Sequence, residues 1–198
     1  MIITYQNSSS FSFTEKDFSL LTDPWDPSGN PVIKTKEARV ILSSLAEKAP
    51  AAIPASPHFL RYPGEYEINN IIITGIDGGI DAQTGKRTTL YTLLINGVTI
   101  AYLGYANTLV SAAQLEVIGD ANILMVPLGE EGTGGVSTAM KNISAIEPQV
   151  VIPARYSAQT LEEFKKEFGG KYMTLAKYAV DRKNLPTEET ELVILESK

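Results

Sequence analysis

The sequence predicts an α/β protein in which a layered β-sheet is covered by helices. The first half of the chain is rich in short strand patterns, whereas the second half alternates strands with helices. The apolar runs from Ile123 to Leu128 and from Val150 to Ile152 are typical of strands that are buried on both faces. Because such strands need cover on both sides, the helices are expected outside the sheet.

The first third of the chain is predicted to be β structure. A break with three prolines and one glycine spans residues 23–31, and the stretch 43–56, rich in Ala and Pro, is expected to be loop with one helical turn at most. The expected strands here are Ile2 to Tyr5, Phe11 to Phe13, Phe18 to Thr22 and Val40 to Leu42.

The middle of the chain carries hairpin signals. Pro63-Gly64 indicates a turn between two strand-like pieces, and Asn96-Gly97 is typical of a tight β-hairpin. The expected strands are Ile71 to Ile76, Leu90 to Ile95 and Val98 to Leu103, with a hairpin loop over Asp77 to Lys86.

Three helices are expected in the second half, before a last strand over Thr190 to Leu195. Two begin at capping boxes, in which a Ser or Thr and the side chain three residues later cap the first turn. The boxes are Ser111 to Gln114, with Gly119 as the stop, and Thr160 to Glu163, with Gly169 as the stop; the other helix runs from Ser137 to Ile146.

Composition narrows the functional classes. The 198 residues predict a single domain over 1–198, and the net charge of −6 argues against a nucleic-acid or anionic membrane surface. With no Cys and only one His, the chain offers neither a thiolate zinc site nor a multi-histidine centre, so only an all-oxygen Mg²⁺ or Ca²⁺ site stays open. No targeting segment is recognised, and a cytoplasmic location is expected.

Individual motifs give weak functional signals. His58 falls in an expected surface loop, where a lone imidazole is more often solvated than catalytic. Glu65 and Glu67 share one strand face, which is expected to be solvated. The loop from Gly129 to Gly135 joins a strand to a helix, but its Glu130 and Glu131 would repel an anion.

Several stretches resemble the metallo-β-lactamase superfamily, particularly its small hydrolase-like branch. The resemblance covers nearly the whole chain, and the stretch from Tyr62 to Ile68, similar to a "GPGEYEI" motif, is its most specific part. The other matching stretches are Met1 to Gln6, Leu20 to Pro24, Tyr102 to Gly104, Leu115 to Gly129 and Ile146 to Pro153.

This resemblance implies a four-layer αββα sandwich that hydrolyses its substrate at one or two zinc ions. The family's zinc ligands are an H-x-H-x-D-H loop, a later His, an Asp and a final His. This chain departs from the family at those positions. At the H-x-H-x-D-H positions stand Ser44, Ala46, Lys48 and Ala49, with Glu47 at the variable position before Lys48. The family's later Asp is Tyr105 here, its later His falls near Asn107 or Thr108, and its final His is Arg155, which Tyr156 follows. Gln6 replaces an earlier His, and Asp23, which supports the loop in the family, is kept.

Zinc is therefore not expected here, and no other cofactor is predicted. Lys48 and Arg155 are cations, and burying them unpaired would be costly. Asp23 and Glu47 are the expected ion-pair partners. A rival hypothesis is that the two cations bind a small anion.

Three functional hypotheses follow. The first is a non-catalytic pseudo-hydrolase with a binding, assembly or regulatory role, whose partner is a small anion or a protein. The second is a hydrolase that uses metal-independent residues of the same cleft, namely Tyr105, Arg155, Lys48, Ser44 or Glu47. The third is a site completed by another copy of the chain in a homo-oligomer.

Overall fold

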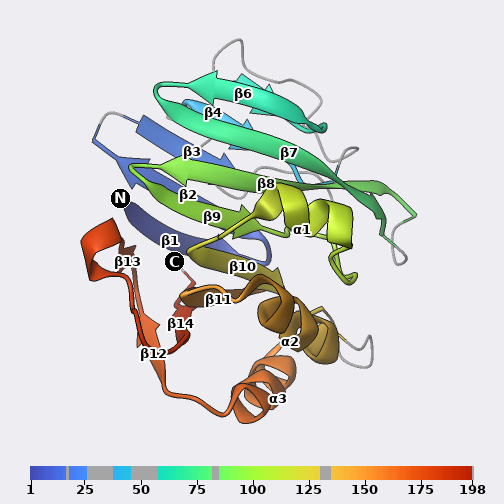
Figure 1. The fold of residues 1–198 in the computed structure, drawn as a ribbon, viewed down its shortest axis with the longest axis vertical. Coiled ribbons are helices and arrows are strands. Elements are labelled where there is room, and N and C mark those ends of the chain that lie inside the picture. Colours follow the sequence, from blue (N-terminus) through green and yellow to red (C-terminus); the bar gives the residue numbers. More distant parts are fainter. Residues whose placement is uncertain (17, 26–37, 46–57, 82–84, 130–134, 198) are drawn as a thin grey trace.

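Two β-sheets face each other, and three helices lie against the outer face of one of them (Figure 1). The computed structural model describes residues 1–16, 18–25, 38–45, 58–81, 85–129 and 135–197. The loops expected around residues 26–31 and 46–56 lie outside this part of the chain. No helix within the described ranges is long and apolar enough to cross a membrane.

The first sheet has six strands in the order β13-β1-β2-β3-β4-β5. Strands β1, β2 and β3 form an antiparallel meander, and β4 and β5 continue from β3 in parallel. The bounds are β1 Ile2–Asn7, β2 Ser10–Glu15, β3 Phe18–Thr22, β4 Val40–Leu42, β5 His58–Leu60 and β13 Tyr178–Ala179.

The second sheet has eight strands in the order β12-β14-β11-β10-β9-β8-β7-β6. Its β6 to β9 part is antiparallel, and its β9, β10, β11, β14 and β12 part is parallel. The bounds are β6 Gly64–Ile68, β7 Ile71–Ile80, β8 Arg87–Ile95, β9 Val98–Tyr102, β10 Ile123–Pro127, β11 Val150–Ala154, β12 Tyr172–Leu175 and β14 Glu191–Leu195.

The helices follow the strands of the parallel part. Helix α1 spans Ala112–Ile118, α2 spans Gly135–Ile146, α3 spans Ala158–Phe168, and a short 3₁₀ turn spans Arg182–Asn184. The predicted cap of α1 is confirmed, because the side chains of Ser111 and Gln114 each bond the backbone N–H of the other residue. The predicted start of α3 is wrong: Ser157 is its N-cap, and Thr160 closes the box from the third position.

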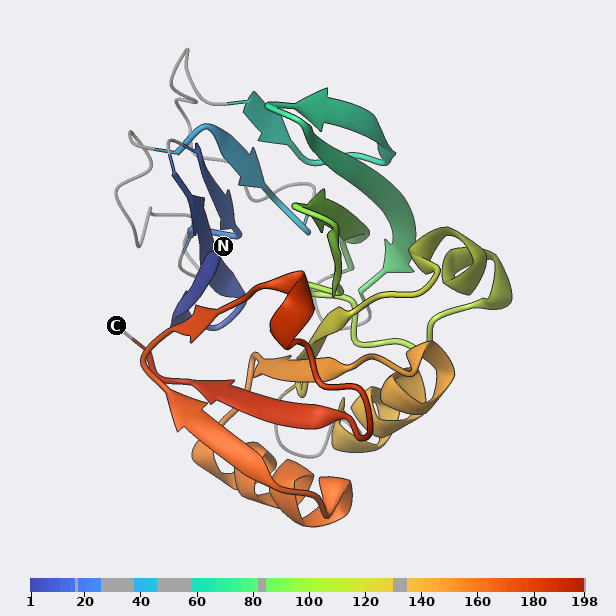
Figure 2. The same cartoon turned by 60° about the vertical axis from the view of Figure 1, so that its left-hand side comes forward.

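Two apolar cores hold the layers together. Residues from both sheets form the core between them, including Phe11, Phe13, Ile73, Leu93 and Ile152. The other face of the eight-stranded sheet packs against the helices through residues such as Leu124, Val151 and Phe164. Figure 2 shows the first three strands, in blue, on the side away from the helices.

The predicted α/β sandwich is confirmed, and three of its four expected layers fall within the described residues. Three details differ from the prediction. Strand β7 continues into the stretch expected to be a loop, β8 begins three residues earlier than expected, and the edge strands β12 and β13 were not predicted. His58 is exposed as expected, but it begins strand β5 instead of lying in a loop.

Candidate functional site

Four of the residues indicated by the resemblance meet at one end of the sandwich. Asp23 and Ser44 follow the parallel strands β3 and β4, whereas Tyr105 and Arg155 follow β9 and β11 of the other sheet. Hydrogen bonds join them one after another, from Asp23 to Ser44, from Ser44 to Tyr105 and from Tyr105 to Arg155. The structure therefore brings together four of the residues that the resemblance indicated.

The carboxylate of Asp23 is the centre of this cluster. Its side chain is almost completely buried, and its backbone is in the left-handed region at φ 39°. Oδ1 accepts the backbone N–H of Ser44 at 2.8 Å, and Oδ2 accepts the Ser44 hydroxyl at 2.5 Å. Oδ2 also lies in a short hydrogen bond with the hydroxyl of Tyr102. Both oxygens are thus engaged by donors from this chain.

Tyr102 reaches this carboxylate from the opposite sheet. Its hydroxyl also lies 2.7 Å from the backbone oxygen of Ser9, which accepts a second bond from Thr22 Oγ1 at 3.0 Å. Burial, and then the charge of Asp23, raises the pKa of Tyr102 well above its ordinary value. The phenol therefore keeps its proton and acts as a donor.

Tyr102 was not predicted as a site residue. Its alternation with Ile100 in strand β9 places it on the face toward the other sheet, which is the signal that the sequence offered.

Ser44 is fixed by close packing as well as by hydrogen bonds. It is fully buried, and its hydroxyl accepts the backbone N–H of Tyr105 at 3.1 Å. Gly104 packs directly on it, because a Cβ built at Gly104 would lie 2.2 Å from Ser44 Cβ. Gly104 also has a φ of 56°, so both the space and the backbone require glycine. No larger side chain fits between these two strand ends without movement.

Arg155 contacts Tyr105 instead of Asp23. Its guanidinium carbon lies 4.1 Å from the centroid of the Tyr105 ring, and Nη1 donates to the Tyr105 backbone oxygen at 3.2 Å. Its backbone N–H donates to Ser8 O at 2.9 Å. Among the described residues, Arg155 therefore contacts an aromatic ring and makes no ion pair with Asp23.

The other predicted residues with described placement make their contacts outside this cluster. Gln6 donates to Thr4 Oγ1 at 3.3 Å, and Tyr156 stacks on Tyr5 with 5.9 Å between ring centroids. The side-chain oxygen of Asn107 is buried without a hydrogen-bond partner. Ala46, Glu47, Lys48 and Ala49 lie outside the described residues, so their predicted ion pair or anion contact stays a prediction.

The residues present do not fit a zinc ion. Catalytic zinc is held by imidazole, thiolate or carboxylate ligands, usually three of them from the protein. At the family's positions this chain has a buried serine, two alanines, a lysine, a tyrosine and an arginine. In the ranges with described placement, no three His, Cys, Asp or Glu side chains come together. His58 begins β5, opposite Val40, and therefore lies at the far end of the strands from Asp23.

Comparison with known proteins agrees with this architecture. The family model described as "Beta-lactamase superfamily domain" matches residues 2–155. A UPF0173 protein of Pyrococcus furiosus is 37% identical over 90 residues, which are 42% of this chain and 42% of that protein. The match thus spans less than half of that relative's length.

Solved structures share the fold over most of the chain. A proposed Zn-dependent hydrolase of the metallo-β-lactamase superfamily from Thermotoga maritima has a TM-score of 0.81 at 24% identity, covering 100% of this chain and 99% of that one. The metallo-β-lactamase fold protein YhfI from Bacillus subtilis has a TM-score of 0.64 at 11% identity, covering 99% and 97%. At these identities the likeness concerns the fold alone.

Proposed function

Because the chain belongs to the beta-lactamase superfamily but lacks the donors of its zinc site, we propose that it is a metal-independent, non-catalytic member with a binding role. The observation that carries this proposal is the hydrogen-bond network around Asp23. The serine at the first ligand position donates to this carboxylate, and Tyr102 engages it from the other sheet.

The network has a structural role at the position that corresponds to the family's catalytic zinc site. In a zinc hydrolase, the metal lowers the pKa of its bound water to about 7 and so generates the nucleophile. Here the protein's own hydroxyl groups satisfy the central carboxylate, and the adjacent strand ends are packed closely through Gly104. This arrangement joins the two sheets without needing a metal.

A small anion is the ligand class that the cluster favours. Arg155 is half-buried, lies over the Tyr105 ring, and uses one guanidinium N–H for the Tyr105 oxygen. A guanidinium carries five N–H donors, and a fixed fork suits carboxylate or phosphate. We therefore take Arg155 as the anchor of the proposed binding role; a protein partner or a homo-oligomer remains the other prediction.

Metal-independent hydrolysis has less support. Ser44 is fully buried and its proton is directed to Asp23, so the hydroxyl has neither access to a substrate nor an imidazole as base. Tyr105 is largely buried beneath Arg155.

A hydrolysis screen tests the non-catalytic role. The purified protein is assayed with β-lactam, phosphodiester and thioester substrates, each with chelator, with added Zn²⁺ and with added Mn²⁺. We expect no turnover above buffer in any condition. Turnover that is abolished by Asp23→Asn, but retained by Asp77→Asn at an exposed carboxylate, would contradict the proposal.

A further inference from the structure

Strand β6 forms one edge of the eight-stranded sheet, and Figure 1 shows it as the outermost strand of that sheet. It pairs with β7 on one side, and no strand of the described residues pairs with its other side. An uncovered sheet edge presents backbone N–H and C=O groups that can pair with another chain. This edge is separate from the Asp23 cluster, whose members follow β3, β4, β9 and β11.

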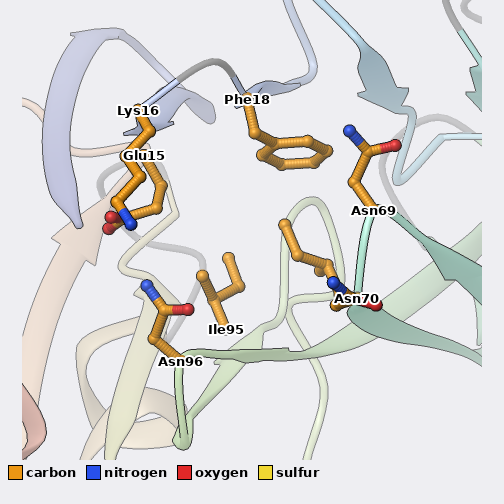
Figure 3. A pocket seen from close by; sticks show the side chains of 8 residues that line it. Glu15, Lys16, Phe18, Asn69, Asn70, Ile95 and Asn96 are labelled. Atoms are coloured by element: carbon orange, nitrogen blue, oxygen red, sulfur yellow. The ribbon is translucent and has the colours of Figure 1, made fainter.

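The turn between β6 and β7 determines which way each β6 residue hydrogen-bonds. Asn69 and Asn70, both labelled in Figure 3, form this two-residue turn with φ values of 54° and 61°. Such a turn closes on a hydrogen-bonded pair, here Ile68 and Ile71, and bonded and non-bonded pairs then alternate along the two strands. Every second residue of β6, counted from Ile68, therefore bonds β7. The residues between them direct their N–H and C=O groups away from β7.

Glu65 and Glu67 are the two residues whose backbone groups point outward. Their side chains are exposed on one face of the strand, whereas Tyr66 and Ile68 on the other face are half-buried against the core between the sheets. Among the described residues, neither glutamate forms an ion pair. The β6 edge therefore combines outward backbone groups with two negative charges on one face and an apolar surface on the other.

A second copy of the chain is a poor occupant of this edge. If two copies paired their β6 strands antiparallel about a two-fold axis, Glu65 would lie opposite the partner's Glu67 in the register that uses both outward-facing residues. Like charges directly opposite each other destabilise a strand pair. The net charge of −6 on the whole chain also opposes self-association through an acidic edge. The charge of the edge therefore favours a positively charged partner.

We propose that the β6 edge binds an extended, basic segment of a partner protein by strand addition. An added antiparallel strand hydrogen-bonds the outward N–H and C=O groups of Glu65 and Glu67. Lys or Arg directly opposite each glutamate neutralises its charge, and apolar residues at the alternate positions lie beside Tyr66 and Ile68. The partner is thus an extended segment in which basic and apolar residues alternate.

The probe is the peptide acetyl-Val-Lys-Val-Lys-Val-amide, labelled with a fluorophore and titrated with the full chain. Fluorescence anisotropy measures its dissociation constant. Because its lysines lie opposite the outward-facing glutamates, the lysine backbone N–H groups are the ones that bond β6. N-methylation of both lysines removes these donors. N-methylation of two valines is the matched control, because the valine N–H groups point away from β6.

The key protein variant is Glu65→Gln/Glu67→Gln, which removes both charges and keeps the backbone groups. Glu188→Gln/Glu189→Gln is its matched control, because it removes the same charge from two exposed glutamates outside β6. We expect saturable binding of the unmodified peptide, weakened roughly tenfold in the β6 variant and nearly unchanged in the control variant.

Lysine methylation is expected to abolish binding, whereas valine methylation is expected to retain it. The proposal would be overturned by no saturable binding of the unmodified peptide, by equal weakening in the two double variants, or by equal binding of the lysine-methylated peptide. None of these readouts involves the Asp23 cluster, metal or hydrolysis, so the result is independent of the proposed function.

Discussion

The Tyr102 hydroxyl of the eight-stranded sheet hydrogen-bonds the Asp23 carboxylate of the six-stranded sheet. The same hydroxyl lies 2.7 Å from Ser9 O, which belongs to the turn between β1 and β2. One phenol thus links the two sheets at the end where the family places its metal. Removing this hydrogen bond is expected to lower the free energy of unfolding of the whole sandwich.

Replacing Tyr102 by Phe is expected to lower the free energy of unfolding by about 1–3 kcal/mol, because a buried carboxylate loses a donor. Urea denaturation measures this change. Tyr91→Phe is the matched control, since Tyr91 is equally buried but its hydroxyl bonds the neutral backbone oxygens of Ser43 and Leu60. A loss in Tyr102→Phe no larger than that in Tyr91→Phe would contradict the role of the carboxylate.

Replacing Gly104 by Ala is expected to destabilise the protein by roughly 2–4 kcal/mol, because the new methyl group would overlap Ser44 and the backbone would be strained. Chemical denaturation gives the value. Gly119→Ala separates the two causes, since Gly119 has a φ of 58° and open space around its Cβ position. Equal losses in the two variants would show that contact with Ser44 contributes nothing.

High pH is expected to destabilise the fold through its buried tyrosines. Burial, and then the charge of Asp23, raises the pKa of both Tyr102 and Tyr91 above their ordinary value near 10. Above pH ~10 the unfolded chain loses these protons while the folded chain keeps them, so the free energy of unfolding falls as pH rises. The slope is at most about 1.4 kcal/mol per pH unit for each tyrosine.

Urea denaturation at several pH values between about 9 and 11 checks this slope. Tyr102→Phe should flatten it, because one of the protons retained by the folded state is removed. A variant with the same slope as the original protein would show that Tyr102 does not contribute.

Arg155 is expected to anchor a small anion. Phosphate or acetate should raise the melting temperature of the original protein in a saturable way, and Arg155→Gln should abolish that increase. Arg39→Gln, at an exposed position, controls for nonspecific loss of positive charge. An anion response that persists in Arg155→Gln would place the ligand elsewhere.

Local patterns predicted much of the fold. The Ser111 cap and the Asn96-Gly97 hairpin depend on neighbouring residues and were confirmed. The predicted start of α3 was wrong because either Ser157 or Thr160 can cap a helix N-terminus. Which of them does so depends on where the chain leaves β11. The edge strand over Tyr172–Leu175 is short and exposed, so it carries no buried apolar pattern.

The candidate site was predictable only in part. The resemblance placed Asp23 and Ser44 at neighbouring strand ends, and the structure joins them directly. The engagement of Asp23 by Tyr102 depends on how two sheets stack, which no local pattern encodes. For the same reason, the preference of Arg155 for the Tyr105 ring over a carboxylate could not be foreseen.

Equilibrium dialysis of the chelator-treated protein against Zn²⁺, with the bound metal quantified by mass spectrometry, tests the central claim most directly. The account predicts far less than one zinc per chain at micromolar free metal, with no difference between the original protein and Asp23→Asn. One tightly bound zinc per chain that is lost in Asp23→Asn would contradict it.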